Sequence, residues 1–215
     1  MVYLPEHFAE CRPEAMRELI ATFPLATLIT VGDDGIAANH IPLLLDPGRG
    51  EHGALIGHVA RINDVWRQGN HRGESLAVFQ AADAYISPNW YASKKETHEV
   101  VPTWNYAVVH TYGQLVVHED EKWLRGIVGR LTKTMEAPQP VPWRMADAPA
   151  SYLKGMLANI VGIELPVSRM IGKWKVSQNR SAADRATASA GLRSTGDPGD
   201  AAMADLIESA GTDIR

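Results

Sequence analysis

The sequence predicts a mainly β fold with added helices, a small antiparallel barrel of about six strands. Strand-like runs rich in β-branched residues are separated by Gly, Pro and Asp residues typical of turns. These runs follow one another with only turns or short helices between them, whereas a doubly wound sheet would need a helix after each strand. Two amphipathic helical patterns occur together before the last strand. We therefore expect an antiparallel barrel with flanking helices.

The first predicted element is a helix, because Pro13 suits the first helical turn and Pro24 ends the apolar pattern. The predicted strands cover residues 25–31, 36–45, 54–60, 75–87, 101–119 and 163–175. The turn at 32–35 joins the first two strands as a β-hairpin. We expect residues 61–70 to form a short helix and residues 88–99 to form an exposed, mobile loop.

Helical spacing of apolar residues predicts two inserted helices, near 120–136 and 148–161. The Ala-rich residues 181–215 are predicted to be helical, with an interruption at 196–199. We expect residues 1–180 to form one domain that includes both inserted helices. The remaining residues would then be a C-terminal helical extension.

The composition is that of an ordinary globular protein, since 45% of the 215 residues are hydrophobic and 21% are charged. The formal net charge of −4 provides no overall attraction to nucleic acid or to an anionic membrane. The single cysteine, Cys11, cannot form an intrachain disulfide, and no apolar run approaches the length that spans a membrane. We expect a soluble cytoplasmic protein.

Residues 172–180 contain three cations, an indole and three neutral hydrogen-bonding side chains. If the strand continues here, Lys173 and Lys175 share one face and Trp174 points to the other. This mixture suits a flat, anionic ligand. In the alternative interpretation, Trp174 packs in the core, both lysines are solvated, and the polar residues cap the next helix. The three neutral polar residues are Ser177, Gln178 and Asn179.

Two other segments also suit a nucleotide-like cofactor. His58 and Arg61 lie where a predicted strand ends, Asn63 begins the next predicted helix, and a planar guanidinium can bind phosphate through two hydrogen bonds. Trp104 and Asn105 lie beside further aromatic residues. FMN needs cations or N–H groups for its phosphate, polar partners for the pyrimidine end of its ring, and apolar cover. In the alternative interpretations, Arg61 is simply solvated, and Trp104 and Asn105 belong to an ordinary sheet surface.

Motifs for several other chemistries are missing from the sequence. Its one GxGxxG pattern, at residues 48–53, lies in a turn that leads into a predicted strand rather than a helix, and no GxxxxGK[ST] motif occurs. Rossmann and P-loop nucleotide binding therefore have no support. The sequence also lacks CxxC, HExxH and GxSxG motifs and an EF-hand loop, so we expect no metal and no serine hydrolase chemistry. No catalytic residue can be chosen from spacing alone.

Six segments of the chain together indicate a family. They are residues 1–8, 38–43, 57–61, 83–88, 101–106 and 172–180. In order and in content they resemble the PaiB-like FMN-binding negative transcriptional regulators, and the resemblance extends to about Leu192. It implies a six-stranded antiparallel split β-barrel with flanking helices, related to pyridoxamine-phosphate oxidases and flavin reductases. It also implies a homodimer with FMN at the subunit interface.

The resemblance further implies a set of residues that bind FMN. Those expected at the phosphate end are His58, Arg61 and Lys173. Those expected at the ring or its surroundings are Trp104, Asn105, Gln178 and Asn179. Asn63 and Lys175 complete the expected cofactor site because they lie in the same polar segments of the sequence, not because of the resemblance.

The family also suggests a regulator, but the sequence offers little to read DNA. Residues 181–215 hold three arginines and six acidic residues, a net charge of −3, whereas a DNA-reading helix is basic. Flavin binding is therefore better supported than direct DNA binding. Three functions follow: an FMN-binding regulator that senses redox state or a ligand, an FMN-dependent oxidoreductase or flavin reductase acting on a small molecule, and a split barrel that binds haem or another flat ligand.

Overall fold

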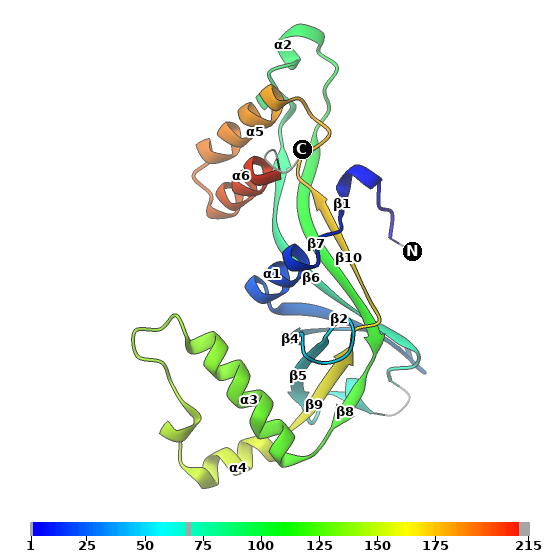
Figure 1. The fold of residues 1–215 in the computed structure, drawn as a ribbon, viewed down its shortest axis with the longest axis vertical. Helices are drawn as coiled ribbons and strands as arrows, with labels where there is room; N and C mark the ends of the chain where they lie inside the picture. The colour runs from blue at the N-terminus through cyan, green and yellow to red at the C-terminus, as the bar shows by residue number, and fades with distance from the viewer. Residues whose placement is uncertain (1, 68–69, 211–215) are drawn as a thin grey trace. The chain divides into compact units, whose positions relative to one another are not determined.

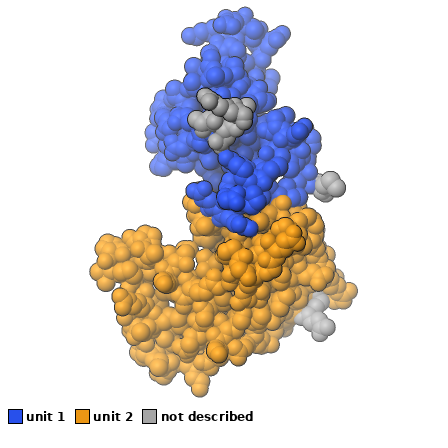
Figure 2. Space-filling view, in the orientation of Figure 1, with its two compact units in different colours: residues 1–19, 80–109, 171–215 blue, residues 20–79, 110–170 orange. Residues whose placement is uncertain are grey.

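The computed structural model describes residues 2–67 and 70–210. The chain forms two compact units, which we describe separately (Figure 2). Unit 1 comprises residues 1–19, 80–109 and 171–215, and unit 2 comprises residues 20–79 and 110–170. Among the described residues, no helix has the length and apolar character needed to cross a membrane.

The fold is mainly β with added helices, which confirms the predicted fold class (Figure 1). A six-stranded antiparallel sheet has the order β1-β10-β7-β6-β2-β3, and a four-stranded sheet has the order β4-β5-β9-β8. The strands are β1 (Ala9–Glu10), β2 (Leu25–Gly32), β3 (Gly35–Pro42), β4 (Leu44–Asp46), β5 (Ala54–Ala60), β6 (Glu74–Ile86), β7 (Thr103–Gln114), β8 (Val116–His118), β9 (Ile160–Pro166) and β10 (Arg169–Lys175). The predicted hairpin is β2–β3, and its turn needs Gly35 because φ there is 104°.

Three of the predicted strands are confirmed to within one residue, as β2, β5 and β6. The other three are each divided in two, because the chain passes from one sheet to the other at the break. At the last break, the N–H of Val167 donates to the carbonyl of Gly53, and the N–H of Ser168 donates to the carbonyl of Tyr112. The chain thereby leaves β9, which pairs with β5, and begins β10, which pairs with β1.

The helices include the predicted first helix, both inserted helices and the C-terminal pair. They are α1 (Pro13–Thr22), α2 (Lys94–Thr97), α3 (Glu121–Glu136), α4 (Ala150–Ala158), α5 (Ala182–Ser194) and α6 (Pro198–Ala210). Four short 3₁₀ helices are η1 (Glu6–Phe8), η2 (Asp64–Trp66), η3 (Pro88–Trp90) and η4 (Met145–Asp147). Helix α4 ends earlier than predicted, because Ile160 and Val161 pair with Ala60 and Val59 in the sheet.

Two other predictions of local structure are wrong. The expected helix at 61–70 is a single 3₁₀ turn in its described residues, and Gln68 and Gly69 lie outside the described part. The expected loop at 88–99 instead contains η3 and α2 and buries Tyr91, so that only residues 95–99 are exposed throughout. The loop prediction rests on local polarity, which does not reveal a single buried residue such as Tyr91.

Each unit has its own apolar core. In unit 1, α5 and α6 pack against each other and against the end of β6. The buried residues of this core are Ala84, Ile86, Tyr91, Val176, Ala188, Leu192, Met203, Ala204 and Ile207. In unit 2, α3 packs on β5 and β9 around Ile56, Ile127 and Leu131.

Candidate functional site

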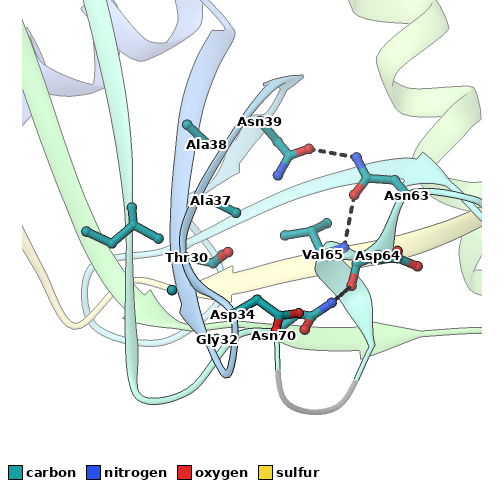
Figure 3. A pocket seen from close by; sticks show the side chains of 12 residues that line it. Thr30, Gly32, Asp34, Ala37, Ala38, Asn39, Asn63, Asp64, Val65 and Asn70 are labelled. Atoms are coloured by element: carbon teal, nitrogen blue, oxygen red, sulfur yellow. Dashed lines mark hydrogen bonds between the residues drawn. The ribbon is translucent and has the colours of Figure 1, made fainter.

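A cavity of about 370 Å³ lies in unit 2, between the β2–β3 hairpin and the segment that carries η2 (Figure 3). We call it the amide pocket, because three asparagines line it. Its polar side chains are those of Thr30, Asp34, Asn39, Asn63, Asp64 and Asn70. The hairpin brings one group of these residues to the cavity, and the turn after β5 brings the other.

Hydrogen bonds orient the amides of this pocket (Figure 3). Asn63 donates from Nδ2 to Oδ1 of Asn39 at 2.7 Å and accepts from the N–H of Val65 at 2.9 Å. Asn70 donates to the carbonyl of Asp64 at 2.7 Å. Thr30 is fully buried, and its hydroxyl has no hydrogen-bond partner among the described residues. Buried polar groups are normally paired, so this hydroxyl is available to a ligand.

His58 and Arg61 lie at the end of β5, also in unit 2. Burial lowers the pKa of His58, which keeps its ring neutral at pH 7, and its Nδ1 atom is buried without a partner in the described structure. Arg61 already makes hydrogen bonds within the protein. Its guanidinium donates to Glu119 at 2.6 Å and to the carbonyls of Ala158 and Ile160 at 2.9 and 3.1 Å. A phosphate at Arg61 would therefore have to displace the Glu119 carboxylate.

A smaller cavity of about 110 Å³ lies in unit 1. We call it the cationic pocket, because Lys175 and Arg180 line it. Its other lining residues are Phe8, Tyr91, Val101, Pro102, Thr103, Asn105, Ser177 and Asn179. Three residues from the predicted cofactor set, Asn105, Lys175 and Asn179, thus come together here.

The alternation along β10 separates the indole from the two lysines. Trp174 packs against the core of unit 1, as the alternative interpretation held. The lysines, however, are not freely solvated. Lys173 is 8% exposed and donates to the carbonyl of Tyr3 at 3.0 Å, with its ammonium 5.4 Å from the ring centroid of Tyr106. Half-buried Lys175 donates to the hydroxyl of Thr103 and to the carbonyl of Trp104.

Lys175 experiences both burial and neighbouring positive charge. Burial lowers its pKa most, and the charges of Lys173 and Arg180 lower it further. The chain therefore holds this ammonium in surroundings that disfavour its charge. A bound anion would reverse that effect.

The remaining predicted residues have other surroundings. Gln178 closes the turn after β10, since its side chain accepts from the N–H of Val176 at 2.8 Å and donates to the carbonyl of Trp174. Trp104 is 55% exposed and meets Tyr85 edge-on, with ring centroids 6.1 Å apart. Asn63 belongs to the amide pocket.

Sequence reasoning missed several lining residues. Asn39 and Arg180 lie within segments that the sequence had singled out, at 38–43 and 172–180, so a signal for them existed. No signal pointed to Tyr91, because it lies in the segment expected to be an exposed loop. Nothing in the sequence distinguished Thr30 from its neighbours, because it lies in a mainly apolar run predicted to be a strand.

Known proteins resemble this chain over most of its length. Residues 2–169 match a protein-family model described as "Putative FMN-binding domain". An uncharacterized protein of Emericella nidulans is 30% identical over 245 residues, which cover 98% of each chain. "Protease synthase and sporulation protein PAI 2" of Bacillus subtilis is 29% identical over 208 residues, covering 96% of this chain and 97% of that relative.

Among solved structures, the FAD and Heme binding protein from Mycobacterium smegmatis has a TM-score of 0.56 and 22% identity. The similarity covers 78% of this chain and 73% of the other. At this identity the comparison shows a shared fold.

Proposed function

We propose that this chain, which belongs to the PaiB-like family of FMN-binding split-barrel proteins, is a homodimeric flavoprotein that regulates in response to redox state or a small ligand. The family assignment confirms the predicted family and the predicted cofactor, FMN. The regulatory role and the homodimer are the proposed steps.

The amide pocket is the observation that carries the proposal. The pyrimidine end of a flavin presents both hydrogen-bond donors and acceptors, and the side-chain amides of Asn39, Asn63 and Asn70 offer both. The unpartnered hydroxyl of Thr30 adds one more such group. A volume of about 370 Å³ is within the range of small-molecule sites. When bound, FMN supplies one- and two-electron redox chemistry.

The phosphate end is assigned to the end of β5. The neutral ring of His58 has a free Nδ1 atom, and Arg61 has the planar fork that suits a phosphate. Glu119 occupies part of that fork, so binding would exchange one anion for another. For Lys173, a role at the phosphate stays a prediction.

The proposed regulatory role draws support from the printed name of the Bacillus subtilis relative, which refers to protease synthesis and sporulation. Direct DNA contact by the C-terminal helices is not part of the proposal. Arg193 of α5 is paired with Asp205 and Glu208 of α6, so it does not form a basic stripe.

An FMN-dependent oxidoreductase is the second candidate. The observation in its favour is the cationic pocket, which offers a place for an anionic reactant. Haem or another flat ligand is the third, because a structure of the same fold is described as binding FAD and haem.

Absorption spectra separate these functions. Purified protein is measured with and without added FMN and then mixed with NAD(P)H in the absence of oxygen. We expect FMN to bind and its visible absorption to persist with little turnover. Rapid bleaching by NAD(P)H would favour the oxidoreductase. A protein that cannot be reconstituted with FMN would contradict both, and a haem titration would then test the third function.

Variants test the two ends of the site. Arg61→Ala and Lys173→Ala are each expected to weaken FMN about 10-fold or more and to leave riboflavin unchanged, because only FMN carries the phosphate. Asn63→Ala is expected to weaken both ligands. Exposed Lys95 of α2 provides the control, Lys95→Ala. Unchanged FMN affinity in both cation variants would contradict the phosphate assignment. Sedimentation of the protein with and without FMN tests the homodimer.

A further inference from the structure

The cationic pocket of unit 1 gathers positive charge that no carboxylate neutralises directly. Within the described ranges, no ion pair links Lys173, Lys175 or Arg180 to an acidic side chain. Both lysines instead donate to neutral oxygen atoms. Asp184 attracts Arg180 only at longer range and already accepts hydrogen bonds from Ser93.

Neutral donors complete the lining of this pocket. Tyr91 is 1% exposed, and its hydroxyl has no hydrogen-bond partner in the described structure. The guanidinium of Arg180 lies over the Tyr91 ring, with Cζ 4.7 Å from the centroid. Buried Asn105 and exposed Asn179 add side-chain amides. A buried hydroxyl without a partner beside two cations matches the needs of a small oxyanion.

The size of the pocket decides what can occupy it. Its volume of about 110 Å³ is a few times the roughly 30 Å³ that a water molecule takes up in the liquid, and it lies well below the roughly 300 Å³ at which sites for drug-sized ligands begin. A three-ring flavin does not fit such a space, whereas one phosphate or carboxylate group does. The amide pocket has the larger volume that the flavin ring needs.

We propose that the cationic pocket binds the phosphate or carboxylate group of a small molecule other than FMN, with Arg180, Lys175 and the Tyr91 hydroxyl as its ligands. This assignment departs from the expectation that Asn105, Lys175 and Asn179 hold FMN. It gives the protein a second, anionic ligand, such as a reactant or an effector. The proposal does not depend on FMN binding.

Calorimetric titration of the whole chain tests the proposal, with inorganic phosphate and acetate as separate probes at constant ionic strength. Each probe is titrated into the protein both saturated with FMN and free of it. We expect at least one of the two anions to bind once per chain, with the same affinity in both forms. Comparison of phosphate with acetate then identifies the preferred class of oxyanion.

Three variants test whether the anion binds at the proposed ligands. Arg180→Gln is expected to weaken the bound anion about 10-fold or more, and Tyr91→Phe about 5-fold, while FMN affinity stays within twofold. Lys95→Gln removes an exposed positive charge from the same unit and is expected to change nothing. Tyr91→Phe keeps the aromatic ring in the core, so it remains informative if Arg180→Gln fails to fold.

Three results would overturn the proposal. The first is that neither anion binds either form of the protein. The second is loss of anion binding when the protein is saturated with FMN. That result would indicate that the phosphate of FMN itself occupies the pocket. The third is an equal loss of anion affinity in Arg180→Gln and Lys95→Gln. That result would mean that the anion responds to the general positive charge of the surface and not to a specific site. Because the FMN-free protein is titrated separately, failure of FMN to bind would contradict the proposed function without deciding this test.

Discussion

The carboxylate of Asp184 accepts two hydrogen bonds from Ser93, one from its backbone N–H and one from its hydroxyl, both at 2.9 Å. Asp184 lies in the first turn of α5 and is 4% exposed. Ser93 directly precedes α2. This pair holds the segment after β6 onto the C-terminal helices of unit 1, which explains why residues 88–94 are not a free loop.

Asp184→Asn is expected to destabilise the protein by about 1 to 3 kcal/mol, because an amide nitrogen cannot accept the hydrogen bonds that a carboxylate accepts. Denaturant unfolding at pH 7 measures the change. Asp205→Asn is the control, since that side chain is 70% exposed and its ion pair with Arg193 is expected to contribute less than about 1 kcal/mol. Equal losses in both variants would contradict the role of Ser93.

The carboxylate of Asp184 also makes the stability of the protein depend on pH. Burial acts to raise the pKa of Asp184, but hydrogen bonds from Ser93 and Ser181 and the charge of Arg180 outweigh it, and the net pKa is lowered. Its contribution to stability is therefore complete above the ordinary carboxyl pKa and is lost as the pH falls through the lowered value. The stability difference between the wild type and Asp184→Asn should shrink at acidic pH.

Lys175 predicts a change in the same direction with pH, but in the alkaline range. Its lowered pKa means that the native state releases the proton before the unfolded state does. As the pH rises from the lowered value toward the ordinary 10.5, wild-type stability should rise relative to Lys175→Met. Unfolding free energies of both proteins from pH 7 to pH 10 measure this difference. A flat or falling difference would show that the surroundings of Lys175 do not disfavour its charge.

Gly113 in β7 is expected to tolerate no side chain. A Cβ atom there would lie 2.1 Å from the carbonyl oxygen of Pro166, so backbone must move. Gly113→Ala should destabilise the protein by about 1 to 3 kcal/mol in thermal or denaturant unfolding. Gly126→Ala is the matched control. It lies on the exposed side of α3 with open space around it, and alanine there should stabilise by about 0.5 to 1 kcal/mol.

A buried hydrogen bond links two strand ends of unit 1. The amide of Asn105 donates to the hydroxyl of Ser177 at 2.9 Å, and both residues are buried. Ser177→Ala leaves that amide without its acceptor and should cost about 1 to 3 kcal/mol. Ser194→Ala removes an exposed hydroxyl and should change stability by less than about 0.5 kcal/mol. Unfolding curves of the two variants should therefore separate clearly.

The sequence predicted most of the strands because each is a local apolar run next to turn residues, as β2 and β5 show. It did not predict the division of residues 163–175, because the change of sheet depends on partners far along the chain. Ile160 and Val161 fit both a helix and a strand, and only their pairing with β5 decides between them.

For the candidate site, the sequence identified the cations but not their surroundings. Lys175 and Asn105 were singled out by residue type, and the structure places both at one pocket. Tyr91 joins them from a segment that Asp184 anchors through Ser93, and that contact spans 91 residues of sequence. Local patterns carry no information about such distant pairs.

The alternation of Trp174 with two lysines along β10 also disfavours incorrect registers of this strand. A slip of one residue against β1 would turn Trp174 away from the core of unit 1 and turn Lys173 and Lys175 toward it. Burying an ammonium among aliphatic side chains costs several kcal/mol, so the misaligned strand would be rejected as the protein folds. The charges that prepare this strand to bind an anion therefore also serve to specify its register.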